Sequence, residues 1–276
     1  MTAVRQRTIA RPCVIEGRGL HSGTPSRIRC LPAGADTGII FTPASGPQIP
    51  AGLDSVVDTR RGVTLGRGGY VVRTVEHFLA AAQALRIANV HVEVDGEELP
   101  ALDGSALPYA HALQDAGDQP QDAPWAPRAP AAPIWVTQGA ASILLLPASI
   151  PRISYVVPTG VDALGVQSVD FVDPTHAFLE EIAPARTWGF ADELDRLRAE
   201  GLAFGASEEN TLGLGPSGYL WPPRFPDEPA RHKVLDLLGD LALLGRPVRA
   251  HVIAVAAGHA LHVELARRIA AGTANR

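Results

Sequence analysis

The chain has 276 residues, of which 46% are hydrophobic and 19% are charged, and its net charge at pH 7 is −5. This composition excludes a disordered chain and favours a globular protein with enough residues for two domains, each with its own core. The acidic balance and the scattered arginines also argue against a protein that binds nucleic acid.

Charge is distributed unevenly along the chain. Residues 1–73 contain ten arginines against four acidic residues, a balance of +6, which leaves −11 for the rest of a chain whose total is −5. Such asymmetry favours an anionic substrate or membrane headgroups near the N-terminal part, although solvent-facing residues often differ in this way without a function.

Cysteine usage and hydropathy predict a soluble, cytoplasmic protein. Cys13 and Cys30 have no metal-ligand spacing and are too few for a disulfide framework, so we expect reduced thiols. Arginines interrupt residues 1–17, where a signal peptide would need an apolar segment. The longest apolar run, near residues 143–146, is too short to span a bilayer, so any contact with the inner membrane is expected to be transient and from the cytoplasmic side.

The first half of the chain predicts one sheet and two helices. Glycine turns separate its strands, and Thr74 is a good N-cap residue for the first helix because an acidic residue follows in the first turn. The expected elements are strands at residues 8–15, 26–31 and 38–42, continued in the same sheet by 56–59 and 62–65, a helix at 74–82, a strand at 90–94 and a helix from Ser105 to Asp115.

A proline- and alanine-rich segment divides the chain. Residues 118–133 (DQPQDAPWAPRAPAAP) show no periodicity, which is typical of a semi-rigid, extended linker. We therefore predict an N-terminal domain at 1–118, a linker at 119–133 and a C-terminal domain at 134–276.

The second half repeats the order of the first, with strands, a long helix that carries histidine, one strand and a final helix. The expected elements are strands at 141–146, 152–157 and 166–171, helices at 176–182 and 191–200, a helix at 229–245, a strand at 250–255 and a helix from His259 to Ala271. This order lacks strict βαβ alternation, so we predict an α+β protein made of two similar α/β sandwich domains.

The helix at 229–245 carries the strongest chemical pattern. His232 and Asp236 are four residues apart and project from one face, and Asp240 lies within about 80° of His232 at 100° per residue. Leucines fill much of the remaining circumference, and isolated buried charge is unfavourable, so a divalent metal is an economical explanation. A simple hydrogen-bonded His–Asp pair is the alternative.

A second histidine-bearing helix suggests the rest of a metal site. A catalytic zinc takes three protein ligands and keeps one position open for water, and His77, His232 and Asp236 would supply those ligands. Glu76 would then be free to act as a general base. His77 could instead be a core histidine bonded to a carbonyl.

Two further residues suit the same chemistry. His259 follows a glycine at a helix start and could donate a proton to a leaving group, with Asp240 to orient its ring. Thr187, in the segment ARTWGF, offers a hydroxyl for a developing oxyanion. A helix-capping histidine and an ordinary strand threonine are the alternatives.

Several motifs, taken in order, resemble the UDP-3-O-acyl-N-acetylglucosamine deacetylase family, zinc amidases of lipid A biosynthesis. The resemblance covers nearly the whole chain and rests on Gly19–Gly23, Thr74–His77, Leu102–Ala106, Ala185–Phe190, Asp227–Glu228 with Arg231–Leu241, and Gly258–Leu261.

This resemblance implies roles for individual residues. It implies that His77, His232 and Asp236 bind zinc, that Glu76 is the base, and that His259, oriented by Asp240, is the electrostatic and acid partner. It also implies that Thr187 stabilises the oxyanion and that Lys233, the only lysine of the chain, contacts the anionic part of the substrate. Two imidazoles and one carboxylate suit Fe²⁺ as well as Zn²⁺.

The resemblance further implies an active site between the two domains and a substrate that is a UDP-linked acylated amino sugar bound by a monomer. An insertion at about 191–215 is expected to form an apolar passage for the acyl chain. The residues expected to bind substrate, besides Lys233, are Trp188, Leu194, Ala206 and Ser207.

The chain departs from the family pattern at a few positions. Trp188 replaces a phenylalanine, Ala206 a glycine, and Gly213 a larger apolar residue, while Ala256 lies in a segment that lacks a common lysine and His262 replaces an asparagine. These departures motivate a rival, a deacetylase of the same fold that acts on another N-acetyl sugar. A second rival is a binding protein with a structural metal, for which His21 or His262 would be the fourth ligand.

Overall fold

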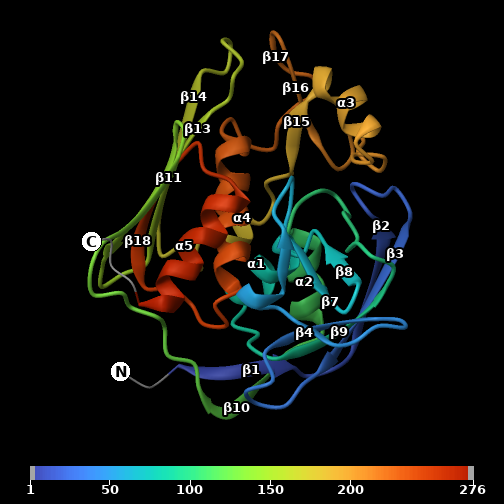
Figure 1. Ribbon diagram of the computed structural model, residues 1–276, viewed down its shortest axis with the longest axis vertical. Helices are drawn as coiled ribbons and strands as arrows, with labels where there is room; N and C mark the ends of the chain where they lie inside the picture. The colour runs from blue at the N-terminus through green and yellow to red at the C-terminus, as the bar shows by residue number, and fades with distance from the viewer. Residues whose placement is uncertain (1–3, 273–276) are drawn as a thin grey trace.

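In the computed structural model, which describes residues 4–272, two five-stranded sheets form the outer layers and four helices lie between them (Figure 1). The N-terminal layer contains β2 (Cys13–Arg18), β3 (Pro25–Pro32), β4 (Ile39–Pro43), β5 (Ile49–Pro50) and β9 (Val90–Asp95), with helices α1 (Glu76–Ala84) and α2 (Leu107–Asp115). The C-terminal layer contains β11 (Ile134–Gln138), β12 (Ala141–Pro147), β13 (Arg152–Pro158), β14 (Val166–Val172) and β18 (Ala250–Val255), with α4 (Glu228–Ala242) and α5 (His259–Ala271).

The two sheets have the same topology, which confirms the predicted duplication and the α+β class. Their strand orders are β2-β3-β9-β4-β5 and β11-β12-β18-β13-β14. In both, the strand that follows the long helix is in the middle of the sheet. Strand β9 pairs antiparallel with β3 and parallel with β4, and β18 pairs antiparallel with β12 and parallel with β13. Each sheet buries only one face: in β14, buried and exposed residues alternate along its whole length.

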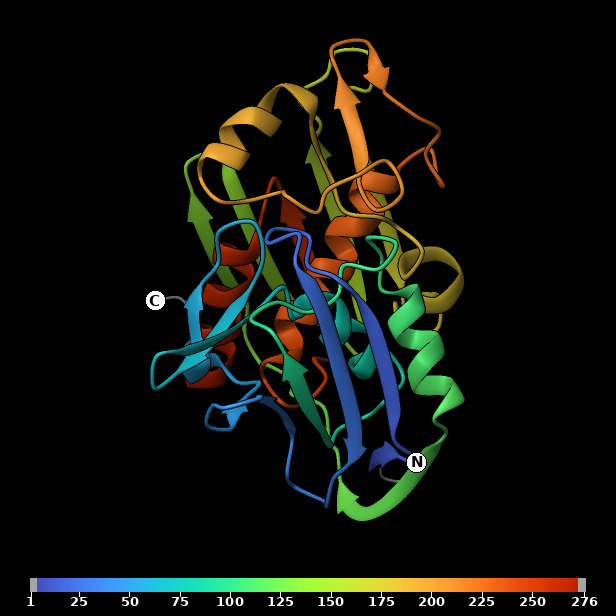
Figure 2. The ribbon, with the colours of Figure 1, turned by 90° about the vertical axis from the view of Figure 1, so that its right-hand side faces the viewer.

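Each half also carries a small three-stranded sheet before its long helix. These are β6 (Val56–Asp58), β7 (Thr64–Arg67) and β8 (Tyr70–Arg73) in the first half, and β15 (Trp188–Phe190), β16 (Leu212–Gly215) and β17 (Gly218–Tyr219) in the second. The strands β15–β17 and the short helix α3 (Leu194–Ala199) project beyond one end of the helix layers (Figures 1 and 2). Short 3₁₀ and π turns occur at Leu53–Ser55, Phe178–Ile182 and Ala191–Glu193.

Three local predictions for the first half were wrong. The expected strand at 8–15 is two strands, β1 (Arg5–Ile9) and β2, because β1 leaves the large sheet. The expected continuation of that sheet at 56–65 is the separate β6-β7-β8 sheet. Thr74 is not an N-cap: α1 begins at Glu76, and Thr74 has a left-handed φ of 58° while its hydroxyl donates to Glu98.

The extended segment after α2 is bound to both halves of the molecule. Its first part, β10 (Asp118–Pro124), pairs antiparallel with β1. Beyond it, the indole N–H of Trp125 donates to the carbonyl of Gly245 at 2.9 Å, and Arg128 forms a bridge with Val248. The division into domains at 118 and 134 stays a prediction.

Helices α1 and α4 pack against each other at the centre of the molecule. A Cβ atom on Gly239 of α4 would lie only 2.1 Å from the backbone carbonyl oxygen of Glu76 on α1. The glycine therefore permits a backbone-to-backbone approach, and it brings the imidazole rings of His77 and His232 to 5.0 Å between centroids. No helix in residues 4–272 combines the length and apolar character that a bilayer span requires.

We predict that Gly239→Ala separates the two helices and lowers the free energy of unfolding. Alanine gains about 1 kcal/mol of helix propensity over glycine. Overpacking against an immobile backbone typically exceeds that gain, at about 1–3 kcal/mol or more. Urea denaturation measures the difference. Gly52→Ala is the matched control, because nothing lies within 4 Å of its added Cβ; equal stability of the two variants would contradict the close approach.

Candidate metal centre

Three side chains from α1 and α4 converge on one point. His77 lies in the first turn of α1, and His232 and Asp236 lie one turn apart on α4. The Nε2 atoms of His77 and His232 lie 3.7 and 3.3 Å from Oδ1 of Asp236, and the ligand atoms of the three residues are all within 4.8 Å of one another. All three side chains are buried.

The donor atoms fit a divalent metal. Tetrahedral zinc with bonds of about 2.0–2.2 Å separates its ligand atoms by about 3.3 Å, close to the observed spacing. Oδ1 of Asp236 is buried and has no hydrogen-bond partner within residues 4–272, an arrangement that is unfavourable unless something else occupies that position. Nδ1 of His232 donates to the carbonyl of Ala185 at 3.0 Å, so Nε2 turns its lone pair toward Asp236.

The electrostatics favour the protonation states that metals bind. Burial lowers the pKa of His232 to about 3, which keeps the imidazole neutral. Burial alone would raise the pKa of Asp236, but neighbouring positive charge, that of Lys233 in particular, holds it well below its usual range. Nζ of Lys233 lies 2.8 Å from Oδ2 of Asp236, so the carboxylate is ionised and its other oxygen faces the histidines.

Glu76 lies beside the three ligands with one oxygen committed to the backbone. Its Oε2 accepts the N–H of Val63 at 2.9 Å. A Cβ on Gly62 would come within 2.8 Å of Oε1, so the glycine leaves space beside this second oxygen. Burial raises the pKa of Glu76, which makes its carboxylate a stronger base than a solvated one.

A second cluster lies one turn further along α4. Oδ2 of Asp240 accepts hydrogen bonds from Nδ1 of His259 and Nδ1 of His262, both at 2.8 Å. Proximity alone makes this cluster another candidate metal group. The short spacing between nitrogen and oxygen instead indicates N–H donors, because ligands of one metal lie about 3.3 Å apart.

The two histidines of this second cluster differ in the charge that their surroundings favour. Burial disfavours the imidazolium of His259, but Asp240 and Asp236 outweigh that effect and raise its pKa to about 9. Burial would raise the pKa of Asp240, and the contacts with His259 and His262 lower it below its usual value. Burial lowers the pKa of His262. The arrangement therefore favours a charged His259 and a neutral His262.

Helix α4 also fixes the turn that carries Thr187. Oε1 of Glu228 accepts both the backbone N–H and the side-chain Nε–H of Arg186 at 2.9 Å. Nδ1 of His232 donates to the carbonyl of Ala185, the residue before Arg186. The backbone N–H of Thr187 donates to the carbonyl of Gly104 at 2.8 Å. Because these bonds hold its backbone, the Thr187 side chain lines the pocket in a defined position.

A pocket of about 700 Å³ lies over the three candidate ligands and is lined by residues from both halves of the chain. Every predicted site residue except Asp240 lines it; Asp240 is fully buried and contacts His259. The predicted residues that line it are Glu76, His77, Thr187, Trp188, Leu194, Ala206, Ser207, His232, Lys233, Asp236 and His259. Leu197, Leu220 and Trp221 continue the pocket along the projecting sheet and α3.

Neither candidate for a fourth metal ligand joins the three. Nε2 of His21 lies 3.2 Å from the carbonyl oxygen of Arg61, and Nδ1 accepts the N–H of Ala203 at 3.4 Å. His262 faces Asp240. Within the described residues the group therefore has three candidate protein ligands, the number found in open catalytic sites, and neither His21 nor His262 adds a fourth.

Glu98 is a structural residue of the site that sequence reasoning missed. Its two carboxylate oxygens accept the backbone N–H groups of His21 and Ser22, each at 2.8 Å. It thereby holds the loop at Gly19–Gly23, which in turn pairs with the backbone of the insertion at Phe204. Nothing in the local segment GEELP distinguishes this acid from its exposed neighbour Glu97, so no sequence signal could have found it.

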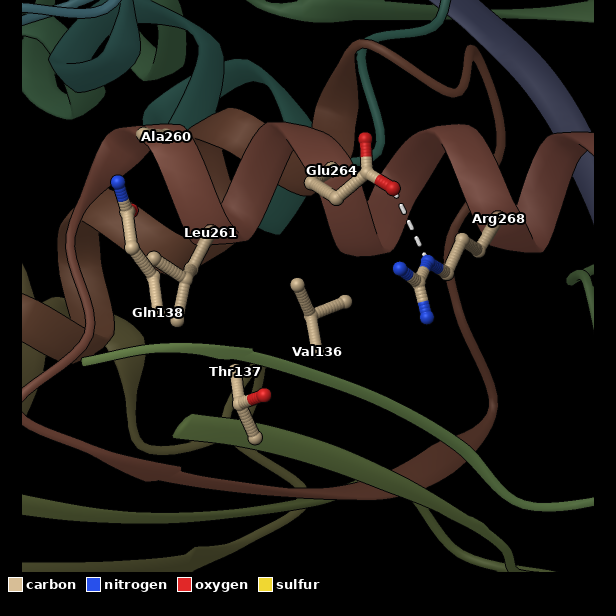
Figure 3. A pocket seen from close by; sticks show the side chains of 7 residues that line it. All are labelled: Val136, Thr137, Gln138, Ala260, Leu261, Glu264 and Arg268. Atoms are coloured by element: carbon tan, nitrogen blue, oxygen red, sulfur yellow. Dashed lines mark hydrogen bonds and ion pairs between the residues drawn. The ribbon is translucent and has the colours of Figure 1, made fainter. Parts of the chain in front are cut away.

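A smaller hollow of about 260 Å³ lies between β11 and α5 (Figure 3). Its lining residues are Val136, Thr137, Gln138, Ala260, Leu261, Glu264 and Arg268. Gln138 also lines the large pocket, and Glu264 is paired with Arg268 at 3.0 Å. This hollow contains none of the predicted site residues, so the chemistry is centred on the larger pocket.

The fold and the donor set define a class of protein: a mixed α/β protein with two imidazoles, one carboxylate and an adjacent buried glutamate, as in metal-dependent hydrolases. The comparison with known families is more specific. The chain belongs to the UDP-3-O-acyl N-acetylglycosamine deacetylase family, whose model matches residues 6–271.

Curated relatives agree with this assignment. The chain is 43% identical to the UDP-3-O-acyl-N-acetylglucosamine deacetylase of Thermosynechococcus vestitus, over 98% of this chain and 95% of the relative. It is 41% identical to the enzyme of the same name from Trichormus variabilis, over 97% and 99% of the two chains. For the Phenylobacterium zucineum enzyme the identity is 40%, over 96% and 93%.

We predict that Asp236→Ala loses the bound metal. The substitution removes one of three ligands and leaves two neutral imidazoles, so metal content of the purified protein should fall to a small fraction of wild type. Elemental analysis measures it. Asp170→Ala, which removes an exposed aspartate paired with Arg152, should retain full metal content. Full metal content in Asp236→Ala would rule out the three-ligand assignment.

Proposed function

We propose that the protein hydrolyses the acetamide of UDP-3-O-acyl-N-acetylglucosamine and releases acetate, a step of lipid A biosynthesis. One observation supports this proposal most strongly: His77, His232 and Asp236 form an open three-ligand group beside Glu76, at the base of a pocket that continues between apolar walls. The curated relatives carry the name of this activity.

We propose Zn²⁺ as the cofactor held by His77, His232 and Asp236, with Fe²⁺ as the alternative that the same donors accept. When bound, zinc supplies a Lewis acid and lowers the pKa of a water molecule in the open position. The protein contributes the neutral imidazoles and the ionised carboxylate that such an ion needs.

Glu76 is the general base in this proposal. The bond from Val63 fixes its orientation, and the space beside Gly62 leaves Oε1 free to take a proton from the attacking water. Burial raises its basicity, which suits proton transfer near neutral pH. Attack on the acetamide carbonyl then generates a tetrahedral oxyanion.

Thr187 and His259 act on that oxyanion and on the leaving amine. The hydroxyl of Thr187 donates to the oxyanion from a turn fixed on α4. The imidazolium of His259, kept charged by Asp240, adds positive charge beside it and is positioned to protonate the amine as the carbon–nitrogen bond breaks. The products are acetate and a free amine.

The remaining pocket suits the two ends of the substrate. Lys233 provides a cation for the anionic part, and its ammonium lies 5.8 Å from the Trp188 ring centroid. Leu194, Ala206 and Ser207 line the part of the pocket that the insertion contributes, which we assign to the acyl chain. The exposed Phe204 and Leu220 near this part are consistent with transient contact with the inner membrane.

The unusual Gly213 is compensated by a neighbouring ring. A Cβ on Gly213 would lie 2.6 Å from Cη2 of Trp221, whose indole N–H donates to the carbonyl of Thr211 at 3.0 Å. The indole thus occupies the space that a larger residue at 213 would need.

We further propose a cytoplasmic monomer, because the substrate class is a nucleotide sugar and one chain supplies the whole pocket lining.

We predict that Glu76→Ala and His259→Ala each lower turnover by roughly 10²–10⁴-fold, the usual contribution of a general base or acid. Steady-state kinetics with the acylated substrate measure the loss. Metal analysis of the same preparations is the control, since neither side chain is a proposed ligand. Normal turnover of both variants with full metal content would refute the assigned roles.

We predict that the enzyme strongly prefers the 3-O-acylated UDP sugar to the non-acylated one.

A second prediction of the same assay concerns Gly213→Leu, whose side chain would collide with the Trp221 indole and narrow the passage. The kcat/KM of this variant for long acyl chains should fall by about 10–200-fold, the range for misfit of a small apolar group.

The non-acylated sugar separates the proposed substrate from its rival. Equal kcat/KM for acylated and non-acylated substrates would favour a deacetylase for another N-acetyl sugar. An unchanged acyl preference in Gly213→Leu would show that the acyl chain lies elsewhere.

A further inference from the structure

Helix α5 presents two histidines, one turn apart, to a single carboxylate oxygen. His259 faces the pocket, whereas His262 is fully buried behind it. Both Nδ1 atoms lie 2.8 Å from Oδ2 of Asp240. A carboxylate only accepts hydrogen bonds, so both nitrogens carry a proton and both rings donate to the same atom.

The second donor matters because Asp240 has few other restraints. Its Oδ1 is buried without a hydrogen-bond partner among the described residues. If His259 were the sole donor, the carboxylate and the ring could turn together, and the ring face presented to the pocket would not be fixed. The N–H of His262 approaches from the buried side and therefore fixes the carboxylate independently of His259.

The burial of His262 favours a neutral ring. His262 is fully buried, so an imidazolium there would lose its hydration. Burial accordingly lowers the pKa of His262. A neutral imidazole has one N–H, and the bond to Asp240 requires that it be on Nδ1.

Tyr155 of β13 contacts the other ring nitrogen of His262. Its hydroxyl oxygen lies 2.8 Å from Nε2 of His262 and 2.8 Å from the carbonyl oxygen of Ala257. With the proton of His262 on Nδ1, the phenolic proton lies between two acceptors, the Nε2 lone pair and the carbonyl of Ala257. Ala257 lies two residues before His259, so the same hydroxyl also anchors the chain entering α5.

We propose that His262 is a positioning residue for the deacetylation: its Nδ1–H fixes Asp240, and Asp240 in turn fixes the ring of His259 in the pocket. The inference rests on the proposed function of His259. It also assigns Tyr155 a role, because its hydroxyl contacts Nε2 and holds the His262 ring from the side opposite Asp240. Neither residue lines the pocket, so both act through Asp240.

The test compares His262→Leu with His262→Asn. Leucine removes the donor, and we expect kcat to fall about 10–100-fold, the usual effect of losing a residue that orients a catalytic group. KM and metal content should not change. Asparagine offers an amide N–H to Oδ2 and should recover most of the lost kcat. His251→Asn is the matched control, since His251 lies on β18 and bonds to Ser154 rather than to Asp240.

Proton NMR of the holoenzyme provides a readout that does not depend on activity. Two exchange-protected imidazole N–H protons, one from each ring bonded to Asp240, should resonate downfield of the amides in the wild type. His262→Asn should remove one and leave the other. If leucine prevents folding, Tyr155→Phe tests the same series of hydrogen bonds. We expect a several-fold loss of kcat and a shift of the His262 N–H resonance.

The outcomes separate this inference from the proposed function. Wild-type kcat in both His262→Leu and Tyr155→Phe, or equal losses in the leucine and asparagine variants, would overturn the positioning role. A wild-type protein without deacetylase activity would refute the proposed function, whereas the two N–H signals would still report whether Asp240 binds both rings.

Discussion

The site depends on the contact between α1 and α4 at Gly239. His232, Asp236 and Gly239 follow the i, i+4, i+7 pattern, so one face of α4 carries two metal-ligand candidates and then a residue without a side chain. At that glycine the helix backbones touch, with Glu76 as the neighbour. Since Glu76 and His77 open α1, the same contact brings the proposed base and the third ligand to the other two.

Duplication of the fold explains how such a contact arises. Along the chain of each half, the long helix follows the small three-stranded sheet and precedes the middle strand of the large sheet, β9 or β18. Two copies facing each other put their long helices in the centre, where side chains from both are buried. The halves then diverge in the residues they offer: α1 supplies one candidate ligand and Glu76, whereas α4 supplies two candidate ligands and Asp240.

Sequence reasoning could predict the parts of the site but not their convergence. The bounds of β18 and α5 agree with the expected strand and helix, because apolar alternation and a glycine boundary are local signals. The meeting of His77 with His232 is a long-range fact that no local pattern contains: ligand chemistry suggested the pairing as a hypothesis, and the family resemblance strengthened it. Gly239 was a usable signal, since a glycine inside a helix lowers its stability by about 1 kcal/mol and often marks close packing.

Thr74 illustrates where local propensity fails. Threonine before an acidic residue is a sound N-cap pattern, yet the buried carboxylate of Glu98 takes the hydroxyl and the backbone adopts φ 58°. Glu98 also holds the loop at His21. A residue 24 positions away therefore binds the hydroxyl that was expected to cap α1, and the left-handed conformation falls at Thr74, two residues before the first residue of α1.

The two aspartates of α4 show why residue type alone could not separate a proposed metal ligand from a proposed orienting residue. Asp236 faces the Nε2 lone pair of a ring whose Nδ1 proton is already bound to Ala185, so its oxygen and that nitrogen repel each other unless a cation lies between them. Asp240, one turn later, faces Nδ1–H groups and is satisfied by protons. The distinction therefore lies in which ring nitrogen is turned toward each carboxylate. Backbone carbonyls and neighbouring strands determine that choice, and these come from segments that neither helix contains.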